Sequence, residues 1–347
     1  MTDAQSPLLQ VEDLHVNFDI RSGFLQRVTG KIRAVSGVSF EIEKGKAFGL
    51  VGESGCGKST VARAVLNLQE PSHGRVRFAG QDVAALDAQG KAGFRRRVQA
   101  VFQDPYSSLN PRMKAGSIIA EPIAVHRLKP PGEIAGEVAR LLDICGLPAR
   151  FATLYPHEMS GGQRQRIGIA RALAMGPELI VCDEAVSALD VSIQAQIINL
   201  LEELQRELGL TYLFIGHDLS VVRHLCDDVA VMYLGQIAES APSDALFSGP
   251  SHPYTQALID AVPNPDPDAE ANRIIEPLAG EVPSPANPPP GCVFHPRCSF
   301  ATPVCTRDIP PLEPIEAGHM AACWNVEAAR ARFAEPSNST VLQGAEK

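Results

Sequence analysis

The chain has 347 residues, of which 31 are basic and 40 acidic, so its formal net charge at pH 7 is −9. This length is enough for a full hydrophobic core and more than one structural unit, whereas the acidic balance argues against a nucleic-acid partner, which usually requires a basic surface. The sequence shows neither the roughly 18 consecutive apolar residues of a membrane-spanning helix nor the basic start and apolar run of a secretory signal, so we expect a soluble cytoplasmic protein.

The spacing of apolar residues predicts an α/β fold. Short strands and helices alternate along much of the chain, a pattern that favours a mainly parallel sheet with ligand-binding loops at the carboxyl ends of its strands. Residues 23–30 are rich in glycine and are expected to separate the first two strands. The expected strands cover residues 8–18, 38–42, 47–51, 75–78, 179–182 and 211–215, and the expected helices cover 60–68, 163–175 and 193–208.

Two regions depart from this alternation. Residues from about 104 to 165 are predicted to form a helical subdomain within an α/β unit that spans residues 1–250. Proline becomes frequent from about residue 250, and residues 251–330 are predicted to form a small extension that contains four cysteines. Residues 331–347 are polar and are expected to form a flexible tail.

A glycine-rich loop joins the strand at 47–51 to the next helix and fits the pattern of a phosphate loop. Its backbone N–H groups and the start of the helix can bind phosphate oxygens, because a helix N-terminus has unpaired donors and partial positive charge. Lys58 would reach the β- and γ-phosphates of a nucleotide, and the Ser59 hydroxyl would bind Mg²⁺. The predicted nucleotide-binding residues of this loop are Gly52, Glu53, Ser54, Gly55, Cys56, Gly57, Lys58, Ser59 and Thr60.

Three polar residues follow two of the predicted strands. Asp183 comes after an apolar run, so its carboxylate lies where it can hold Mg²⁺, and Glu184 beside it can act as a general base toward water. The alternative for this pair is a surface acidic pair. His217 follows the strand at 211–215 and can orient the γ-phosphate or the water, or else serve as a structural histidine.

A second glycine-rich segment, Ser160-Gly161-Gly162-Gln163, opens another predicted helix. It is therefore a second site at which backbone donors can bind an anion.

The order of these motifs resembles that of the ATP-binding subunits of ABC transporters over residues from about 8 to 250. The resemblance implies a P-loop ATPase that binds ATP and Mg²⁺ and closes with a second ATPase subunit around the nucleotide. It identifies Gly52–Thr60 as Walker A, Leu179–Asp183 as Walker B and Glu184 as the catalytic glutamate. It further implies that Gln103 binds Mg²⁺ and takes part in catalysis, and that His217 is the switch histidine. By the same resemblance, Ser160–Gln163 binds the partner's ATP and Asp190 ends a loop at the subunit interface. Phe18 would stack on adenine.

Finer features resemble the ATPases of dipeptide and oligopeptide importers, and most of all the second of their two ATPase subunits. These features are Val186–Ser192, His252–Thr255 and the late cysteines. The resemblance implies a heterodimer with another ATPase, two membrane permeases and an extracytoplasmic solute-binding protein, with this chain at the cytoplasmic face of the inner membrane. Nickel, glutathione or an opine are alternative cargoes. A soluble ABC ATPase of DNA repair or of the ribosome is the alternative function, but the chain lacks the long coiled coil or the duplicated motifs of those proteins.

Four cysteines, Cys292, Cys298, Cys305 and Cys323, lie within the proposed extension. Their spacing lacks the close pairs of a zinc ribbon, so zinc, an iron–sulfur cluster and unmetallated thiols all remain possible from the residues. The resemblance implies a [4Fe–4S] cluster. His319 is either a further ligand or, as we favour, a surface histidine. Cys56 is either an oxidisable thiol near a helix N-terminus or simply a side chain small enough for the loop.

Overall fold

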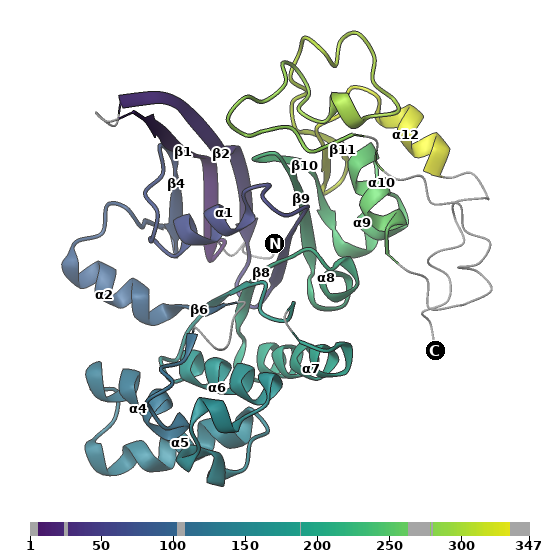
Figure 1. Cartoon of the computed structure of the whole chain (residues 1–347). Coiled ribbons are helices and arrows are strands. Elements are labelled where there is room, and N and C mark those ends of the chain that lie inside the picture. Colours follow the sequence, from purple (N-terminus) through teal and green to yellow (C-terminus); the bar gives the residue numbers. More distant parts are fainter. Residues whose placement is uncertain are drawn as a thin grey trace, which may run out of the picture.

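The computed structural model describes residues 6–23, 27–102, 108–187, 189–262, 278 and 280–333. Within these residues the strands form one sheet of eight, in the order β11-β12-β10-β9-β3-β8-β7-β6, and one of four, in the order β2-β1-β4-β5 (Figure 1). The strands are β1 Leu9–Ser22, β2 Arg27–Ile42, β3 Ala47–Val51, β4 His73–Phe78, β5 Gln81–Asp82, β6 Val98–Phe102, β7 Leu179–Asp183, β8 Thr211–Gly216, β9 Asp228–Tyr233, β10 Gln236–Pro242, β11 Glu313–Glu316 and β12 His319–Ala321.

The helices lie around these sheets. The α-helices are α1 Lys58–Val65, α2 Ala88–Arg97, α4 Ala115–Val125, α5 Ile134–Ile144, α6 Gly161–Leu173, α7 Val191–Leu208, α8 Leu219–Leu225, α9 Ser243–Ser248, α10 Pro253–Asp260 and α12 Val326–Phe333. Short 3-10 helices cover Pro131–Glu133, Ala149–Thr153, Pro156–Glu158 and His295–Arg297. Helices α1 and α6 begin two residues earlier than the sequence predicts, because both predictions left out residues of the motif that starts the helix.

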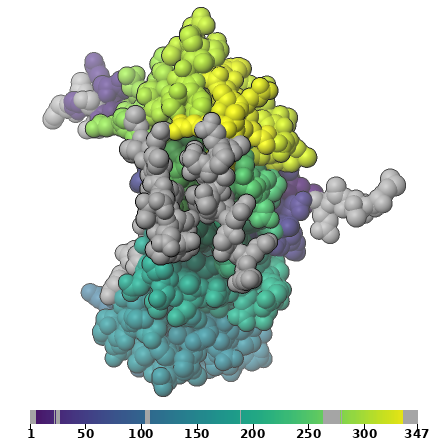
Figure 2. Space-filling model, turned by 90° about the vertical axis from the view of Figure 1, so that its right-hand side faces the viewer, coloured from purple at the N-terminus to yellow at the C-terminus, as the bar shows by residue number. Residues whose placement is uncertain are grey.

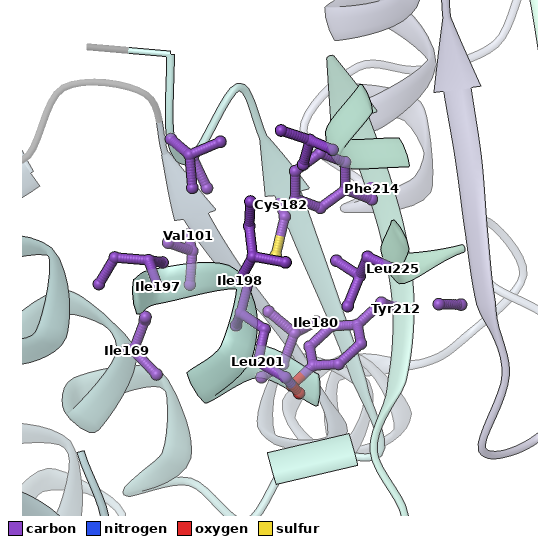
Figure 3. Close-up of a cluster of buried hydrophobic side chains, with 14 of the residues drawn as sticks. Val101, Ile169, Ile180, Cys182, Ile197, Ile198, Leu201, Tyr212, Phe214 and Leu225 are labelled. Carbon is purple, nitrogen blue, oxygen red and sulfur yellow. The ribbon is translucent and has the colours of Figure 1, made fainter. Parts of the chain in front are cut away.

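The large sheet divides the hydrophobic core in two. Strands β9, β3, β8, β7 and β6 are parallel, as the sequence predicts. Successive side chains of a strand point to opposite faces, so Leu179 and Val181 of β7 enter one cluster, whereas Ile180 and Cys182 enter the other. The cluster that contains Ile180 and Cys182 also includes side chains of α7 (Figure 3). This packing fixes the carboxyl ends of β3, β7 and β8 side by side.

The four-stranded antiparallel sheet corrects one prediction. The expected break at 23–30 is too long, because residues 27–30 belong to β2, which pairs with β1 up to Ser22 and Arg27; within this pairing Gly30 lies opposite Ile20. A glycine weakens a strand but does not end it when a neighbouring strand supplies the backbone hydrogen bonds. The sheet covers α1 and encloses the core cluster that contains Leu50 and Val61.

The helical region and the C-terminal extension lie at opposite ends of the molecule (Figure 2). The helical region contains α4, α5 and the start of α6. The extension continues the large sheet, because β12 pairs antiparallel with β10 and β11 pairs with β12. Residues 331–333, which the sequence assigns to a flexible tail, belong to α12, and 334–347 lie outside the described residues.

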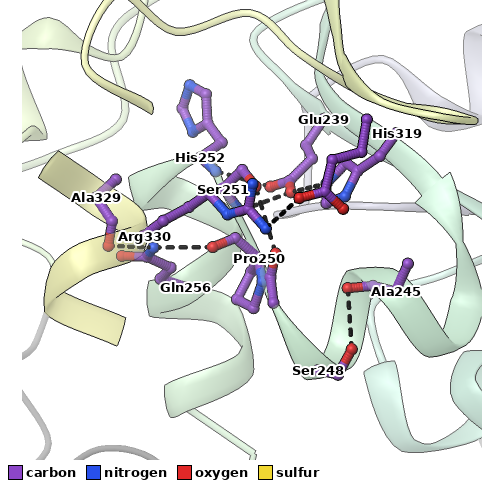
Figure 4. A network of polar contacts seen from close by, with 12 residues as sticks. Glu239, Ala245, Ser248, Pro250, Ser251, His252, Gln256, His319, Ala329 and Arg330 are labelled. Carbon is purple, nitrogen blue, oxygen red and sulfur yellow. Dashed lines mark hydrogen bonds and ion pairs between the residues drawn. The ribbon is translucent and has the colours of Figure 1, made fainter. Parts of the chain in front are cut away.

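His319 also differs from its prediction as a surface histidine. It is only 2% exposed, and its Nε2 lies 2.7 Å from Oε1 of the fully buried Glu239 (Figure 4). Glu239 also accepts hydrogen bonds from the backbone N–H groups of Ser251 and His252. A buried carboxylate requires such partners, and β12 of the extension brings one of them to the core.

Candidate functional site

The loop after β3 has a shape that requires glycine at two positions. Gly52 has φ +149°, and a Cβ atom there would lie 2.1 Å from the carbonyl oxygen of Met232. Gly57 has φ +109°, and its Cβ would lie 2.2 Å from the carbonyl oxygen of Ala34. Both the backbone conformation and the close approach therefore exclude a side chain.

Helix α1 begins directly after this loop and faces a cavity. Gly57 is its N-cap and supplies no side-chain cap. The Thr60 N–H donates to the Gly57 carbonyl oxygen, which leaves the N–H groups of Lys58 and Ser59 at the helix start for an anion. The cavity has a volume of about 180 Å³. It is lined by Ile32, Ala34, Ser54, Gly55, Gly57, Lys58, Ser59, Thr60, Glu184 and Pro285.

Lys58 supplies positive charge at this cavity. Its side chain is almost fully buried, and Nζ donates hydrogen bonds to the carbonyl oxygens of Gly52 (2.8 Å) and Glu53 (2.9 Å). An ammonium group in this position can exchange these neutral acceptors for phosphate oxygens, with which it forms stronger, charge-assisted hydrogen bonds.

Ser59 and Asp183 meet across the site although 124 residues separate them. The Ser59 hydroxyl donates a 3.0 Å hydrogen bond to Oδ1 of Asp183. Burial raises the pKa of Asp183, and the hydrogen bond from Ser59 opposes that shift. A hydroxyl and a carboxylate are oxygen ligands of the kind that Mg²⁺ prefers, so the donor set fits this ion.

Glu184 and His217 lie at the neighbouring strand ends. Glu184 lines the cavity and adopts φ +50°, an uncommon conformation for a residue other than glycine. Its backbone N–H donates to the carbonyl oxygen of Ile215, and its Oε1 lies 3.9 Å from Nδ1 of the half-exposed His217. The carboxylate can therefore take a proton from a water molecule at the edge of the cavity, beside a group that can orient that water.

The Ser160 segment lies at a different place. Ser160 caps α6: its Oγ accepts from the N–H of Gln163, and its own N–H donates to Gln163 Oε1. This helix start borders a second cavity of about 350 Å³ that shares no lining residue with the first. A Cβ on Gly162 would lie 2.4 Å from Cγ2 of Ile193, so α7 packs directly on the start of α6.

Several predicted residues are not brought into the first cavity. Phe18 is 36% exposed and does not line it, although its strand partner Ile32 does. Asp190 is the N-cap residue of α7. Gln103 lies outside the described residues, so its predicted function stays a prediction. Cys56 is buried, and burial raises its thiol pKa, so the idea of a reactive thiolate is not supported and the small side chain simply fills space beside Gly52.

The sequence missed the contacts that Tyr254 and Arg297 make with the loop. The Glu53 N–H donates to the Tyr254 hydroxyl (2.8 Å), and the Glu53 carboxylate accepts from Arg297. Arg297 is 244 residues away, and no local pattern relates the two. A histidine-proline-tyrosine sequence at 252–254 was a visible signal, but it did not indicate this contact.

The four late cysteines are neighbours in space. The pKa of Cys323 is raised to about 12, first by burial and then by the nearby Cys298, Cys292 and Cys305. Polar groups surround the sulfurs: the Asn325 N–H donates to Cys323 Sγ (3.3 Å), and the Asn325 side chain donates to Cys305 Sγ (3.6 Å). Such donors stabilise thiolates bound to a metal.

Within the described residues, one group of at least three possible metal-ligating atoms has all its atoms within 4.8 Å of one another, and it consists of Asp13, His15 and His73. No three of the four cysteine sulfurs therefore come that close together.

Comparisons with known proteins find a matching family for the ATPase core and another for the extension. Residues 35–187 match the family described as ABC transporter, and residues 238–305 match the one described as Oligopeptide/dipeptide transporter, C-terminal region. The Oligopeptide transport ATP-binding protein AppF of Bacillus subtilis (strain 168) is 52% identical over 320 residues, which are 92% of this chain and 97% of that protein. The Probable peptide ABC transporter ATP-binding protein y4tS of Sinorhizobium fredii is 52% identical over 337 residues, which are 97% of this chain and 94% of that protein.

The chain belongs to the ATP-binding proteins of ABC transporters. Its fold agrees with solved structures of this ATPase class. The structure of cbiO1 from Clostridium perfringens, described as part of the ABC transporter complex cbiONQ, has a TM-score of 0.61 and 28% identity and covers 70% of this chain and 91% of that chain. The dimeric ATP-binding cassette MJ0796, bound to ADP and Pi, has a TM-score of 0.60 and 27% identity and covers 68% of this chain and 98% of that chain. The predicted P-loop ABC ATPase core is thus confirmed.

This ABC ATPase contains no helix, in the described part of the chain, that is long and apolar enough to cross a membrane.

Proposed function

We propose that this ATPase powers the import of di- and oligopeptides. The observation that carries the proposal is that one chain joins an ABC-transporter region to an oligopeptide/dipeptide-transporter C-terminal region. Relatives named for oligopeptide transport and peptide import match it over nearly their whole length.

The phosphates of ATP would bind at the loop Gly52–Thr60. The N–H groups at the start of α1 and the Lys58 ammonium group supply the positive field, and Ser59 and Asp183 supply oxygen ligands for Mg²⁺. Bound Mg²⁺ neutralises charge on the β- and γ-phosphates. Gln103 is proposed as a third ligand on the strength of the resemblance, and Phe18 as the residue that stacks on adenine.

Hydrolysis requires a water molecule activated beside the γ-phosphate. Glu184 lines the cavity and is proposed to accept the proton of that water, while His217 orients the water or the phosphate. Because Ser160–Gln163 borders a separate cavity, we propose that it contacts ATP held by a partner subunit, with Asp190 near the same interface. ATP would then join the two subunits, and its hydrolysis would release them.

The remaining partners follow from this class of transporter. We propose a heterodimer with a second ATPase, bound to two membrane permeases at the cytoplasmic face of the inner membrane and served by a solute-binding protein. The domain division at about residue 250, with a helical subdomain at about 104–165, is part of this proposal.

A [4Fe–4S] cluster is the proposed occupant of the four-cysteine site, with zinc as the alternative. Zinc holds thiolates at about 2.3 Å in a tetrahedron, which places the sulfurs about 3.8 Å apart. No three of the four sulfurs lie within 4.8 Å of one another, so a zinc ion would require them to move closer together. Bound to Cys292, Cys298, Cys305 and Cys323, it would stabilise an extension too small to form a core of its own.

The catalytic assignment is tested by Glu184→Gln. The variant should bind MgATP with an affinity close to that of the parent protein and lose at least about 100-fold in kcat, because it keeps the shape but not the base. Unchanged hydrolysis would refute the assignment.

The cargo is tested by peptide uptake. A strain that lacks this gene and requires an amino acid should fail to grow when that residue is supplied as a peptide, but should grow on the free amino acid. The parent gene should restore growth on peptide and the Glu184→Gln gene should not. If the strain that lacks this gene grows normally on peptides but no longer takes up nickel, glutathione or an opine, that compound is the cargo instead.

The cluster is tested by metal analysis of protein purified without oxygen. A [4Fe–4S] protein is brown and contains about four iron atoms per chain. Colourless protein with one zinc per chain would establish the alternative.

A further inference from the structure

We propose that the C-terminal extension holds the phosphate loop in its nucleotide-binding shape, and that Tyr254 and Arg297 are the positioning residues. The proposal rests on the function of this loop as the ATP phosphate site. Both residues contact Glu53, which follows Gly52 at the entrance of the loop. Tyr254 contacts the backbone of Glu53, and Arg297 contacts its side chain.

Arg297 binds the side chain of Glu53 through two hydrogen bonds. Nη1 lies 2.7 Å from Oε2 and Nη2 lies 3.2 Å from Oε1, a bidentate geometry that fixes the carboxylate in direction as well as position. The arginine side chain is only 7% exposed. It lies in the 3-10 helix His295–Arg297, next to Cys298, and its guanidinium group lies 5.9 Å from the ring centre of Tyr233. The folded extension therefore determines where this charge is.

Tyr254 holds the backbone of Glu53. Its hydroxyl accepts the Glu53 N–H, and its ring is fully buried. The ring packs against Tyr233, at 4.7 Å between centroids, and against Phe294, at 5.4 Å. Phe294 is part of the extension, so the aromatic cluster Tyr233, Tyr254 and Phe294 joins β9, α10 and the cysteine-bearing segment behind the loop.

These contacts act on the shape of the loop and not on the reacting atoms. Neither Tyr254 nor Arg297 lines the cavity at α1. Lys58 lines the cavity and donates to the carbonyl oxygens of Gly52 and Glu53. Glu53 is therefore held both by this lysine and by the two residues of the extension. A loop that is ordered before the ligand arrives binds it more tightly, because less conformational freedom is lost on binding.

The predicted consequence is a weaker affinity for MgATP with little change in turnover. Tyr254→Phe keeps the buried ring and removes one acceptor, so its Kd for MgATP should rise about 3- to 10-fold. Arg297→Met should raise Kd about 10-fold or more. The Kd of Arg297→Lys, whose ammonium group cannot form the bidentate pair, should lie between those of Arg297→Met and the parent protein. In all three, KM for ATP should rise with Kd while kcat changes less than twofold.

The experiment measures equilibrium binding of MgATP to the full chain, steady-state hydrolysis, melting temperature and metal content for each variant. Arg307→Met, which replaces an exposed arginine of the same extension, is the matched control and should equal the parent. The double variant Glu53→Gln/Arg297→Met should bind no worse than Arg297→Met alone, because the two residues form one interaction.

Unchanged Kd in folded Tyr254→Phe and Arg297→Lys would overturn the proposal, as would additive losses in the double variant. A loss of kcat without a change in KM would also overturn it, since the residues would then affect chemistry and not the loop. Failure of the parent protein itself to bind MgATP would instead refute the phosphate site on which the proposal rests.

Discussion

The two glycine-rich helix starts of this ATPase, before α1 and before α6, are built differently. The first has a left-handed glycine as its N-cap, a buried lysine and a serine whose hydroxyl donates to an aspartate at the end of β7. The second is capped by its own Ser160 and Gln163 side chains and borders a cavity apart from the first. The difference teaches that the first is equipped to hold a nucleotide within one chain, whereas the second lies apart from that nucleotide site and is proposed to contact a ligand held by a partner subunit.

The largest expected effect is on the first helix start. Gly57→Ala should reduce affinity for MgATP by at least about 100-fold, because its Cβ would lie 2.2 Å from the Ala34 carbonyl and force the loop out of shape. Gly55→Ala is the matched control: φ is +80°, but no atom lies within 4 Å of its Cβ, so only the backbone preference is violated. Its loss should be about 10-fold or less. Equal losses measured by nucleotide titration would show that steric exclusion does not matter there.

The second helix start should behave in the opposite way. Ser160→Asp keeps an N-cap acceptor but places a negative charge where the partner's phosphate would lie. We expect its affinity for MgATP at its own loop to stay within about twofold, and kcat of the two-subunit ATPase to fall at least about 10-fold. Ser160→Asn, an equally good cap without charge, should lose less. If the two variants hydrolyse ATP at the same rate, the segment does not contact phosphate.

The smallest expected effect concerns the support behind the first site. Burial lowers the pKa of His252 to about 4 from an ordinary value near 6.5, so the folded protein binds fewer protons than the unfolded chain between these pH values. The free energy of unfolding should therefore fall as pH is lowered from about 6.5 to about 4, and this residue should contribute no pH dependence above that window. His252→Asn keeps an acceptor for the Tyr254 N–H and should flatten the dependence. The free energy of unfolding is measured by denaturant titration at each pH. If it depends on pH in the same way in His252→Asn and in the parent protein, the dependence does not come from His252.

Much of the ATPase core could be predicted because its signals are local. The apolar run at β7, the glycines of the loop and the polar residues after β7 and β8 lie within short segments, and parallel strands bring their ends together. The first hairpin and the burial of His319 could not be predicted in this way. Gly30 was compatible with a break or a strand, and only its pairing with Ile20 decided between them.

By itself, the sequence indicated that residues 57–60 and Glu184 would lie at one site, because spacing along a strand, loop and helix fixes relative positions and parallel strands end at the same edge of a sheet. It did not indicate Ile32, Ala34 and Pro285, which also line the cavity. Only the tertiary structure decided what lies behind that site. Glu53 meets Tyr254 and Arg297 across 201 and 244 residues of chain. Contacts this distant leave no periodic pattern, because they depend on how β10, α10 and the extension pack together and not on the spacing of side chains within any one element.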